Sequence, residues 1–301
     1  MRLFLALVLS SLAFSASAHA NKTSQNRISI MTYNLENLFD EVNDGLRNET
    51  VLTPKVLDAK LTQLSKGILQ INNVGPDILI TAEVENLRVL KKLNEHLKPA
   101  NYQTIELLES DDERGIDVGI ISRFPLAGKV VLHRMPFSDV NPTRGILEVP
   151  LQVTDKKVIH VFALHFPSQA NPTEQRRQAS EFLRKLMSQV PTNAYAVAGG
   201  DFNITKEEEA KNSYFSGVFE DFKVSHLIGC KNCDGTYFYK NSWSFLDALI
   251  TRENSLVAES VRTPNKALSQ INSNGSPRHF EEKTGLGISD HLPLYGELII
   301  E

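Results

Sequence analysis

The amino-acid sequence predicts an α/β fold made of two packed β-sheets with helices outside them. Strand-like and helix-like stretches alternate along most of the chain, and no repeat, low-complexity segment or interdomain linker interrupts them. Of the 301 residues, 41% are hydrophobic, which is enough for a large core. We therefore expect a single domain over residues 21–301, preceded by a short segment that is not part of the fold.

The first third of the chain alternates between strand and helix. Residues 28–33 have an apolar strand pattern, and apolar residues at helical spacing predict a helix over 56–71. Gly75-Pro76-Asp77 ends that helix, because glycine and proline interrupt helical structure. A buried strand is expected at 78–81 and a second helix at 86–97. This order is typical of an α/β sheet.

The rest of the chain is mainly strands. Thr173 is expected to cap an amphipathic helix that continues to Val190, and Glu174 lies in its first turn. Strand patterns occur at residues 103–108, 116–121, 129–132, 145–153, 158–164, 194–198, 245–251 and 294–300. These patterns supply enough strands for two sheets.

Residues 1–20 have the pattern of a secretory signal peptide. Arg2 supplies a positive charge, residues 3–14 are an apolar run, and Ala18-His19-Ala20 is a cleavage site. The apolar run is shorter than a membrane-spanning helix requires. We expect cleavage after Ala20, a secreted or periplasmic protein, no stable membrane insertion, and a monomer.

The overall charge of the chain limits how it can bind polyanions. Its formal net charge is −4 at pH 7. A strongly basic balance, which would indicate binding to a nucleic-acid backbone, is therefore absent. Any polyanionic substrate must be held by a local patch or by a metal ion.

Polar side chains stand where several of the predicted strands end. Taken alone, each has an ordinary structural alternative, such as a turn residue, an acid at a helix N-terminus or a hydrogen-bonded histidine. Strand ends that share one edge of a sheet converge, so these side chains can line one pocket. The candidates are Asn34, Glu83, His165, Asp201 with Asn203, and Asp290 with His291.

Three of these residues predict a metal site. Mg²⁺ prefers oxygen ligands, keeps several water molecules and needs only one or two carboxylates beside a substrate phosphate. Glu83 fits this role, with Asn34 and Asp290 close to it. The expected cofactor is Mg²⁺, with Mn²⁺ or Ca²⁺ as alternatives.

The remaining candidates fit the hydrolysis of a phosphoester. That reaction needs an activated water, neutralisation of charge on the phosphoryl oxygens and help for the leaving oxygen. Asp201 and His291 can orient or deprotonate water, whereas Asn203 and His165 can donate hydrogen bonds to the phosphate. Asp290 is also a candidate to fix the tautomer of a neighbouring imidazole.

Four motifs follow one another along the chain. They are Met31-Thr32-Tyr33-Asn34-Leu35-Glu36, the segment from Pro76 to Asn86, Ala198-Gly199-Gly200-Asp201-Phe202-Asn203, and Ser289-Asp290-His291-Leu292-Pro293. In this order they resemble the motifs of the endonuclease/exonuclease/phosphatase superfamily. That group includes DNase I-like nucleases, abasic-site endonucleases, sphingomyelinases and inositol polyphosphate 5-phosphatases. The resemblance covers residues 27–301 and implies a DNase I-like four-layer sandwich.

The resemblance also implies the roles of eight residues. The metal would lie near Asn34, Glu83 and Asp290, and the catalytic side chains would be His165, Asp201, Asn203, Asp247 and His291. Asp247 is included because Phe245-Leu246-Asp247 matches the aspartate before a late strand of the family. Arg114 and Asp117 resemble a segment of exported bacterial members.

Two positions depart from the family pattern. Ala82 precedes Glu83 where the family often has glutamine, and Ala248 follows Asp247 where many relatives have arginine. The second departure removes a cation from the neighbourhood of the expected site, so the substrate class does not transfer simply.

The expected activity is that of an exported nuclease, a metal-dependent hydrolase of phosphodiester bonds in nucleic acid. The alternatives are a phosphatase or phospholipase C-like hydrolase of sphingomyelin or inositol phosphate, and a non-catalytic binding protein on the same fold. Tyr237, Tyr239 and Trp243 can stack on bases, match an inositol phosphatase pattern or simply pack. Candidate phosphate-steering cations are Arg144, Arg176, Arg177 and Arg278 with His279.

Two short patterns bear on the compartment and the host. Cys230 and Cys233 are spaced C-x-x-C, and in an exported chain a local disulfide is favoured over a redox or metal role. Asn203-Ile204-Thr205 is an N-glycosylation sequon inside the expected site. Because a sugar there would block catalysis, the sequon favours a bacterial host that does not N-glycosylate exported proteins.

Overall fold

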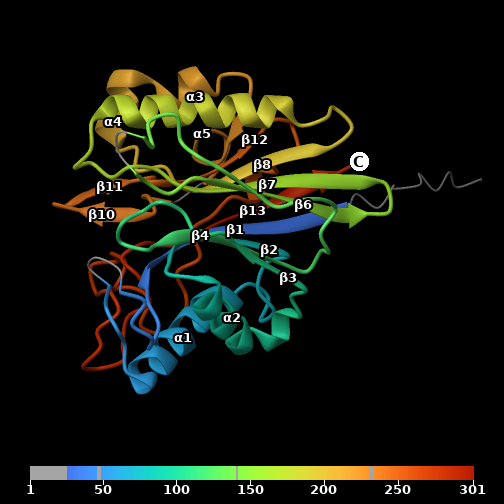
Figure 1. The fold of residues 1–301 in the computed structure, drawn as a ribbon. Coiled ribbons are helices and arrows are strands. Elements are labelled where there is room, and N and C mark those ends of the chain that lie inside the picture. The colour runs from blue at the N-terminus through green and yellow to red at the C-terminus, as the bar shows by residue number, and fades with distance from the viewer. Residues whose placement is uncertain (1–25, 46–48, 140–141, 231–232) are drawn as a thin grey trace, which may run out of the picture.

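A computed structural model describes residues 26–45, 49–139, 142–230 and 233–301, and the predicted signal peptide lies outside these residues. Two β-sheets pack face to face, and helices cover the outer face of each, so that the chain forms four layers (Figure 1). The predicted α/β fold with two packed sheets is confirmed.

The first sheet has five strands and contains both the first and the last strand of the described chain. Its order is β13 (Leu294–Ile300), β1 (Asn26–Leu38), β2 (Ile78–Val84), β4 (Asp117–Ser122) and β3 (Thr104–Leu107). β1 and β2 are parallel, whereas β13 pairs with β1 in antiparallel register. The carboxyl ends of β1 and β2 therefore meet at one edge of the sheet.

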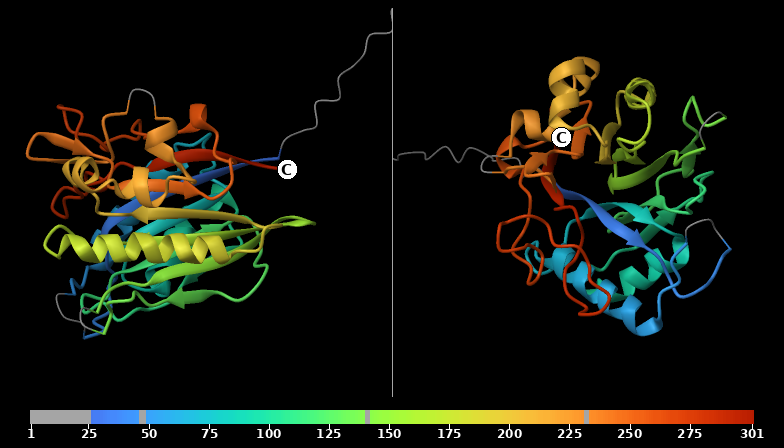
Figure 2. Two further views of the ribbon diagram at one scale, coloured as in Figure 1. Left: turned by 90° about the horizontal axis from the view of Figure 1, so that it is seen from above. Right: turned by 90° about the vertical axis from the view of Figure 1, so that its left-hand side faces the viewer.

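The second sheet has six strands in the order β5 (Val131–His133), β6 (Ile146–Thr154), β7 (Lys157–His165), β8 (Tyr195–Asp201), β12 (Asp247–Thr251) and β9 (Lys223–Val224). β7 and β8 are parallel, and β12 runs antiparallel to β8. A separate hairpin of β10 (Tyr237–Tyr239) and β11 (Ser242–Ser244) projects beside this sheet (Figure 2).

The helices divide between the two outer faces. α1 (Pro54–Leu69) and α2 (Leu87–His96) cover the first sheet, and α3 (Thr173–Gln189), α4 (Lys206–Asn212) and α5 (Ser225–Ile228) lie on the second (Figure 1). Single turns occur at Lys98–Ala100, Tyr214–Val218 and Ala258–Ser260. Thr53 caps α1, because its side-chain oxygen accepts a hydrogen bond from Val56 N.

Three hydrophobic layers hold the sheets and helices together. One lies under α1 and α2, one lies under α3, and the third fills the space between the sheets. Ile80 of the first sheet and Leu249 of the second are fully buried in the central layer. Truncating either to alanine is expected to cost about 2–5 kcal/mol. The sheets therefore form a rigid base for side chains at their edges.

Several strands continue further than predicted. β1 continues past Asn34 to Leu38, and β7 and β8 include His165 and Asp201 as their last residues. Backbone pairing does not stop where the apolar run stops, so the polar residues belong to the strands themselves.

The prediction that Thr173 caps α3 is wrong. Pro172 occupies the N-cap position, and the Thr173 hydroxyl donates to Glu208 Oε1 at 3.1 Å instead. Proline suits the start of a helix because it has no N–H to satisfy. The Thr173 side chain therefore links α3 to Glu208 of α4.

No helix within the described ranges is both long enough and apolar enough to cross a bilayer. The Cys230–Cys233 disulfide that the spacing favoured is present.

Candidate active site

Three neighbouring strands of the second sheet place His165, Asp201 and Asp247 in one row. The parallel pairing of β7 and β8 sets His165 opposite Asp201, and the antiparallel pairing of β12 and β8 sets Asp247 opposite Asp201. Gly200 precedes Asp201 with φ 147°, and a Cβ there would lie 1.9 Å from Leu164 O. Only glycine fits this position, so the glycine of the motif fixes how Asp201 is presented.

Glu83 comes from the first sheet through a β-bulge. The register of β2 against β4 shifts between Ala82 and Val84, and Glu83 has φ 60°. A bulge re-aims the side chain that it carries. Asn37 N donates to Glu83 Oε2 at 2.9 Å, which holds the carboxylate in its new direction.

Asn34 joins the two sheets. Its Nδ2 donates to Glu83 Oε1 at 3.2 Å and to Asp201 Oδ2 at 3.1 Å, while its Oδ1 accepts from Glu36 N at 3.0 Å. Ser289 Oγ donates to the main-chain oxygen of Asn34 at 2.7 Å. The amide nitrogen of Asn34 thus contacts carboxylates from both sheets, while the main chain holds the amide oxygen.

His291 is oriented by Asp247. Its Nδ1 lies 2.7 Å from Asp247 Oδ2, and its Nε2 lies 3.8 Å from Asp201 Oδ2. The sequence suggested that Asp290 fixes an imidazole tautomer. For His291 this is wrong, because its Nδ1 is hydrogen-bonded to Asp247 and not to its neighbour Asp290. Tyr237 packs against the ring of His291, with centroids 4.8 Å apart.

The pKa values of His165 and His291 are shifted in opposite directions. Burial, reinforced by Arg144 and Arg114, lowers the pKa of His165 well below its usual value. Burial alone would also lower the pKa of His291, but Asp247 and Asp290 raise it well above the usual value. The surroundings therefore favour the neutral form of His165 and the protonated form of His291, and the Nε2 atoms of the two rings lie 3.5 Å and 3.8 Å from Asp201 Oδ2.

Burial and a neighbouring charge act in opposite directions on the pKa of Asp201. Burial raises its pKa to about 7, although the charge of His291 acts in the other direction. Its Oδ2 lies 3.5 Å from His165 Nε2, and its Oδ1 accepts from Asn203 N at 2.8 Å. A carboxylate with a pKa near neutrality can accept and return a proton.

Asn203 sits beside Asp201 in a left-handed conformation, with φ 53°. Its Nδ2 donates to Phe166 O at 3.0 Å, and the residue is 7% exposed. The turn after β8 thus holds Asn203 at the surface of the site, where it reaches the same space as Asp201.

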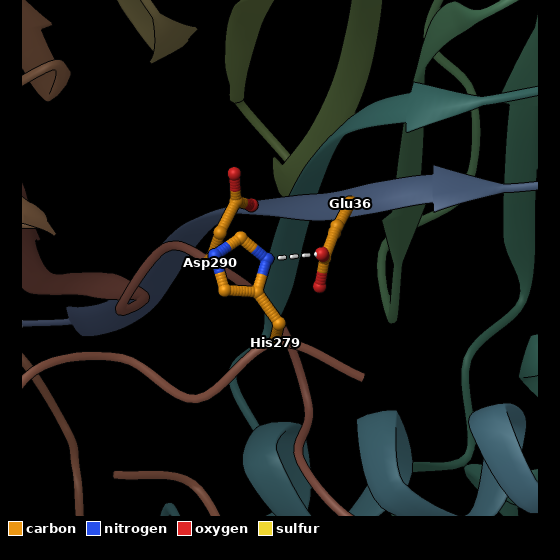
Figure 3. A group of neighbouring side chains, drawn as sticks. All are labelled: Glu36, His279 and Asp290. Atoms are coloured by element: carbon orange, nitrogen blue, oxygen red, sulfur yellow. Dashed lines mark hydrogen bonds and ion pairs between the residues drawn. The ribbon is translucent and has the colours of Figure 1, made fainter. Parts of the chain in front are cut away.

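Asp290 faces a group that includes two residues to which the sequence had given no metal role. Glu36, His279 and Asp290 each place one ligand atom within 4.8 Å of the others, and His279 Nδ1 lies 2.5 Å from Glu36 Oε1 (Figure 3). Glu36 Oε2 accepts from Phe280 N at 3.0 Å. A carboxylate–imidazole set of this kind can hold a divalent cation.

A cleft of about 490 Å³ lies over these groups. Glu83, His165, Asp201, Asn203, Asp290 and His291 line it, together with Arg114, Arg144, Tyr237 and Tyr239. Arg144 is 3% exposed and donates to Asp112 Oδ2 at 2.7 Å. The cleft therefore combines carboxylates, histidines and guanidinium groups at one edge of the two sheets.

A family model described as the Endonuclease/Exonuclease/phosphatase family matches residues 29–298, which include every residue named above for the site. The chain belongs to this family. Comparison by sequence with curated proteins gives no significant match.

Solved structures of endonuclease/exonuclease/phosphatase family proteins share the fold. The Bacteroides vulgatus protein is 16% identical, over 92% of this chain and 100% of its own, with a TM-score of 0.65. TDP2 from D. rerio, humanized by 14 mutations, is 14% identical over 91% of this chain and 99% of its own, with a TM-score of 0.63. D. rerio TDP2 complexed with single-strand DNA product is 15% identical over 91% and 99%, with a TM-score of 0.61.

Some candidates from the sequence lie away from this family site. Arg176 is 1% exposed, because Glu208 and the main-chain oxygens of Pro167 and Ser168 surround its guanidinium. Arg176 is therefore a structural residue and not a phosphate-steering cation. Asp117 is buried and hydrogen-bonded by Ser110, so it stabilises the turn before β4.

Glu36 is the site residue that sequence reasoning missed most clearly. It lies two residues after Asn34 in the same motif, and that shared motif is the signal that could have brought it into the candidate set. The strand period could not have done so, because Glu36 has φ 53° and the pairing of β1 is irregular between Asn34 and Leu38.

Proposed function

We propose that this chain is a metal-dependent hydrolase of phosphodiester bonds and that its substrate is nucleic acid. The observation that carries the proposal is the convergence of Glu83, His165, Asp201 and His291, from two sheets, in one cleft. The family includes endonucleases, exonucleases and phosphatases in its description.

The donor set in the cleft fits a divalent cation. Glu83 and Asp290 offer carboxylate oxygens, and Glu36 and His279 lie next to Asp290. When bound, the cation supplies positive charge to the phosphoryl oxygens. Mg²⁺ suits the carboxylates, whereas the imidazole of His279 makes Mn²⁺ the first alternative and Ca²⁺ a weaker one.

The proposed proton transfers use the opposite charges of the cleft. Asp201 accepts the proton of the attacking water, since burial places its pKa at about 7, and returns a proton to the leaving oxygen as the scissile P–O bond breaks. His291, held by Asp247, donates a hydrogen bond to a phosphoryl oxygen, and Asn203 orients the water or the phosphate. His165 contributes a neutral N–H donor at 3.5 Å from Asp201. Each role stabilises charge that develops in the transition state.

The wall of the cleft supports nucleic acid as the substrate. Tyr239 is 59% exposed and stacks on Tyr237, with centroids 6.4 Å apart. Exposed aromatic rings next to a phosphate site are suited to stacking on bases of a single strand. One of the similar structures, D. rerio TDP2, contains a single-strand DNA product.

The activity can be tested with purified protein on plasmid DNA, single-stranded DNA, RNA, sphingomyelin and an inositol phosphate, each with Mg²⁺, Mn²⁺ or EDTA. We expect cleavage of DNA or RNA that EDTA abolishes. Asp201→Asn should lower kcat by about 10²–10⁴-fold, the range for loss of a general base. Asp155→Asn, in the exposed turn between β6 and β7, is the matched control and should retain full activity.

Three outcomes would contradict parts of this proposal. Turnover of sphingomyelin or inositol phosphate alone would replace the nuclease with a phospholipase C-like enzyme or a phosphatase. Full activity in the presence of EDTA would show that the hydrolysis does not require a metal ion. Binding of these substrates without turnover, unaffected by Asp201→Asn, would indicate a binding protein.

Export to the periplasm or the medium of a bacterium is part of the proposal. The pattern at residues 1–20 and the Cys230–Cys233 disulfide support it, because disulfides persist in oxidising compartments. N-terminal sequencing of the protein recovered from a bacterial periplasm should begin at Asn21. We also propose that the exported protein is a monomer, which sedimentation analysis would check.

A further inference from the structure

Outside the cleft, a second group of acidic side chains gathers where the segment after β1 meets the end of β2. Asp44, Glu49 and Glu85, here called the loop cluster, each place one carboxylate oxygen within 4.8 Å of the others. Asp44 and Glu49 come from the connection between β1 and α1, and Glu85 directly follows β2. Such proximity of carboxylates is unfavourable unless a positive charge is shared among them.

Glu85 carries the inference. The residue is 2% exposed, and its Oε2 accepts from Asp40 N at 2.7 Å. Its Oε1 is also buried, and it has no hydrogen-bond partner in the part of the chain that the structure describes. A buried carboxylate oxygen without a partner is costly, and such groups are normally paired or coordinate a metal ion.

The basic side chain next to the loop cluster, Arg88, contacts Asp44 of the cluster and Asp40 beside it. Arg88 donates from Nε to Asp40 Oδ2 at 2.6 Å and from Nη2 to Asp44 Oδ2 at 2.9 Å. Asn86 Nδ2 also donates to Asp40 Oδ2, at 3.3 Å. These contacts satisfy Asp40 and one oxygen of Asp44, but none of them reaches Glu85 Oε1.

We propose that Asp44, Glu49 and Glu85 bind a Ca²⁺ ion. All three ligands are oxygens, and Ca²⁺ accepts six to eight oxygen ligands, including water, in flexible geometry. Asp44 is partly open to solvent, with 36% of its side chain exposed, so water can complete the shell. Mg²⁺ demands near-ideal octahedral geometry and suits a cluster drawn from two separate segments less well.

The bound ion would join two segments that lead to the cleft. Glu85 N donates to Leu38 O at 3.0 Å, and Asn37 N donates to Glu83 Oε2 at 2.9 Å. Ca²⁺ at Glu85 therefore stabilises the end of β2 that carries Glu83. The ion would bind here whether or not the chain is a hydrolase, so this site and the proposed activity can fail independently.

Thermal unfolding of the full protein, freed of metal with EDTA and then dialysed, tests the site. Adding Ca²⁺ at about a hundred times its Kd should raise the Tm of the wild type by roughly 5 °C. Glu85→Gln keeps the size of the side chain and lets an amide donate to Asp44 or Glu49. It should therefore raise the Tm of the metal-free protein and abolish most of the Ca²⁺-dependent rise.

The variant should thus have a higher Tm than the wild type without Ca²⁺ and lose this advantage when Ca²⁺ is added. At an ordinary structural carboxylate, Glu85→Gln would change the Tm by the same amount with and without Ca²⁺. Isothermal titration with Ca²⁺ gives a second measurement. One binding event should disappear in Glu85→Gln and in Asp44→Asn but persist in Glu83→Gln, which alters the cleft. Binding that is unchanged in both loop variants would overturn the proposal, and so would equal affinity and stabilisation with Mg²⁺.

Discussion

Histidines meet carboxylates in two regions of the second sheet, and the two regions differ in how completely their polar atoms are paired. On the outer strands, His133 Nε2 and His160 Nδ1 lie 2.7 Å and 2.6 Å from the two oxygens of Glu148. In the cleft, His165 and His291 lie 3.5 Å and 3.8 Å from Asp201. In the outer cluster both histidines are hydrogen-bonded to the carboxylate between them, whereas in the cleft His291 is hydrogen-bonded to Asp247 and neither histidine is hydrogen-bonded to Asp201.

The two regions also differ in the burial of their polar atoms. In the described residues of the cleft, His165 Nδ1 and Asp247 Oδ1 are buried without a hydrogen-bond partner. The side chains of His133 and His160 are each about one-fifth exposed, so water can solvate them. Unpaired polar atoms in a buried site cost stability, and sites that must bind a reacting group tolerate this cost. The comparison predicts that changes in the cleft affect reaction rate and that changes in the outer cluster affect stability.

Among the variants that test this comparison at the partners of the active-site groups, the largest effect is expected from Asp247→Asn. Asparagine keeps the shape of the side chain but removes the charge that favours protonated His291, so kcat should fall by about 10²–10³-fold. KM should change much less, because Asp247 does not reach the substrate side of the ring. Steady-state kinetics over a range of pH would measure both parameters. A kcat within twofold of the wild-type value would show that His291 does not need this partner.

A smaller effect is expected from Tyr239→Ala at the wall of the cleft. Loss of one stacked base is worth about 1–3 kcal/mol, so KM for single-stranded DNA should rise at least fivefold with little change in kcat. Tyr239→Phe keeps the aromatic face and is the matched control. If Tyr239→Phe weakens binding as much as Tyr239→Ala, the hydroxyl and not the ring makes the contact.

The smallest effect on activity is expected from Glu148→Gln, which should leave kcat unchanged and lower stability instead. Glu148 is partly buried, and hydrogen bonds from His133 and His160 outweigh that burial and lower its pKa to about 2. Because the folded pKa is below the ordinary value of about 4.5, the stabilisation is present above pH 4.5 and is lost as the pH falls towards 2.

Urea unfolding at several pH values would check whether the stabilisation by Glu148 is lost as the pH falls. The wild type should exceed Glu148→Gln by about 1–2 kcal/mol at pH 6, and the difference should shrink below pH 4.5. A difference that grows as the pH falls would contradict the assignment of the lowered pKa to Glu148.

Sequence reasoning anticipated the strands and the residues at their ends better than the contacts between them. The strand at 294–300 was predicted with the bounds of β13, because an apolar run follows Pro293 directly. The placement of His165 and Asp201 at adjacent strand ends followed from the same patterns. The local sequence predicts where strands begin and end, because strands and turns favour different residue types.

Contacts across long distances were harder to anticipate. The partner of His291 is Asp247 and not its neighbour Asp290, because the fold brings together two segments that lie 44 residues apart in the sequence. The short β10–β11 hairpin also escaped prediction, since strands of three residues carry little periodic signal. Arg176 belongs to a helix with the composition of a solvated face, and only its tertiary partner Glu208 explains its burial.

The pairing of β13 with β1 has a consequence for how the protein comes to be active. Arg27 and Glu297 are 270 residues apart in sequence, yet their side chains form an ion pair between these two strands. Contacts of such sequence separation form late and slow folding, because a long loop must close before they stabilise anything. His291 lies three residues before β13, so the cleft is completed only when β13 docks on β1. A chain in which these two strands have not yet paired therefore lacks the assembled site.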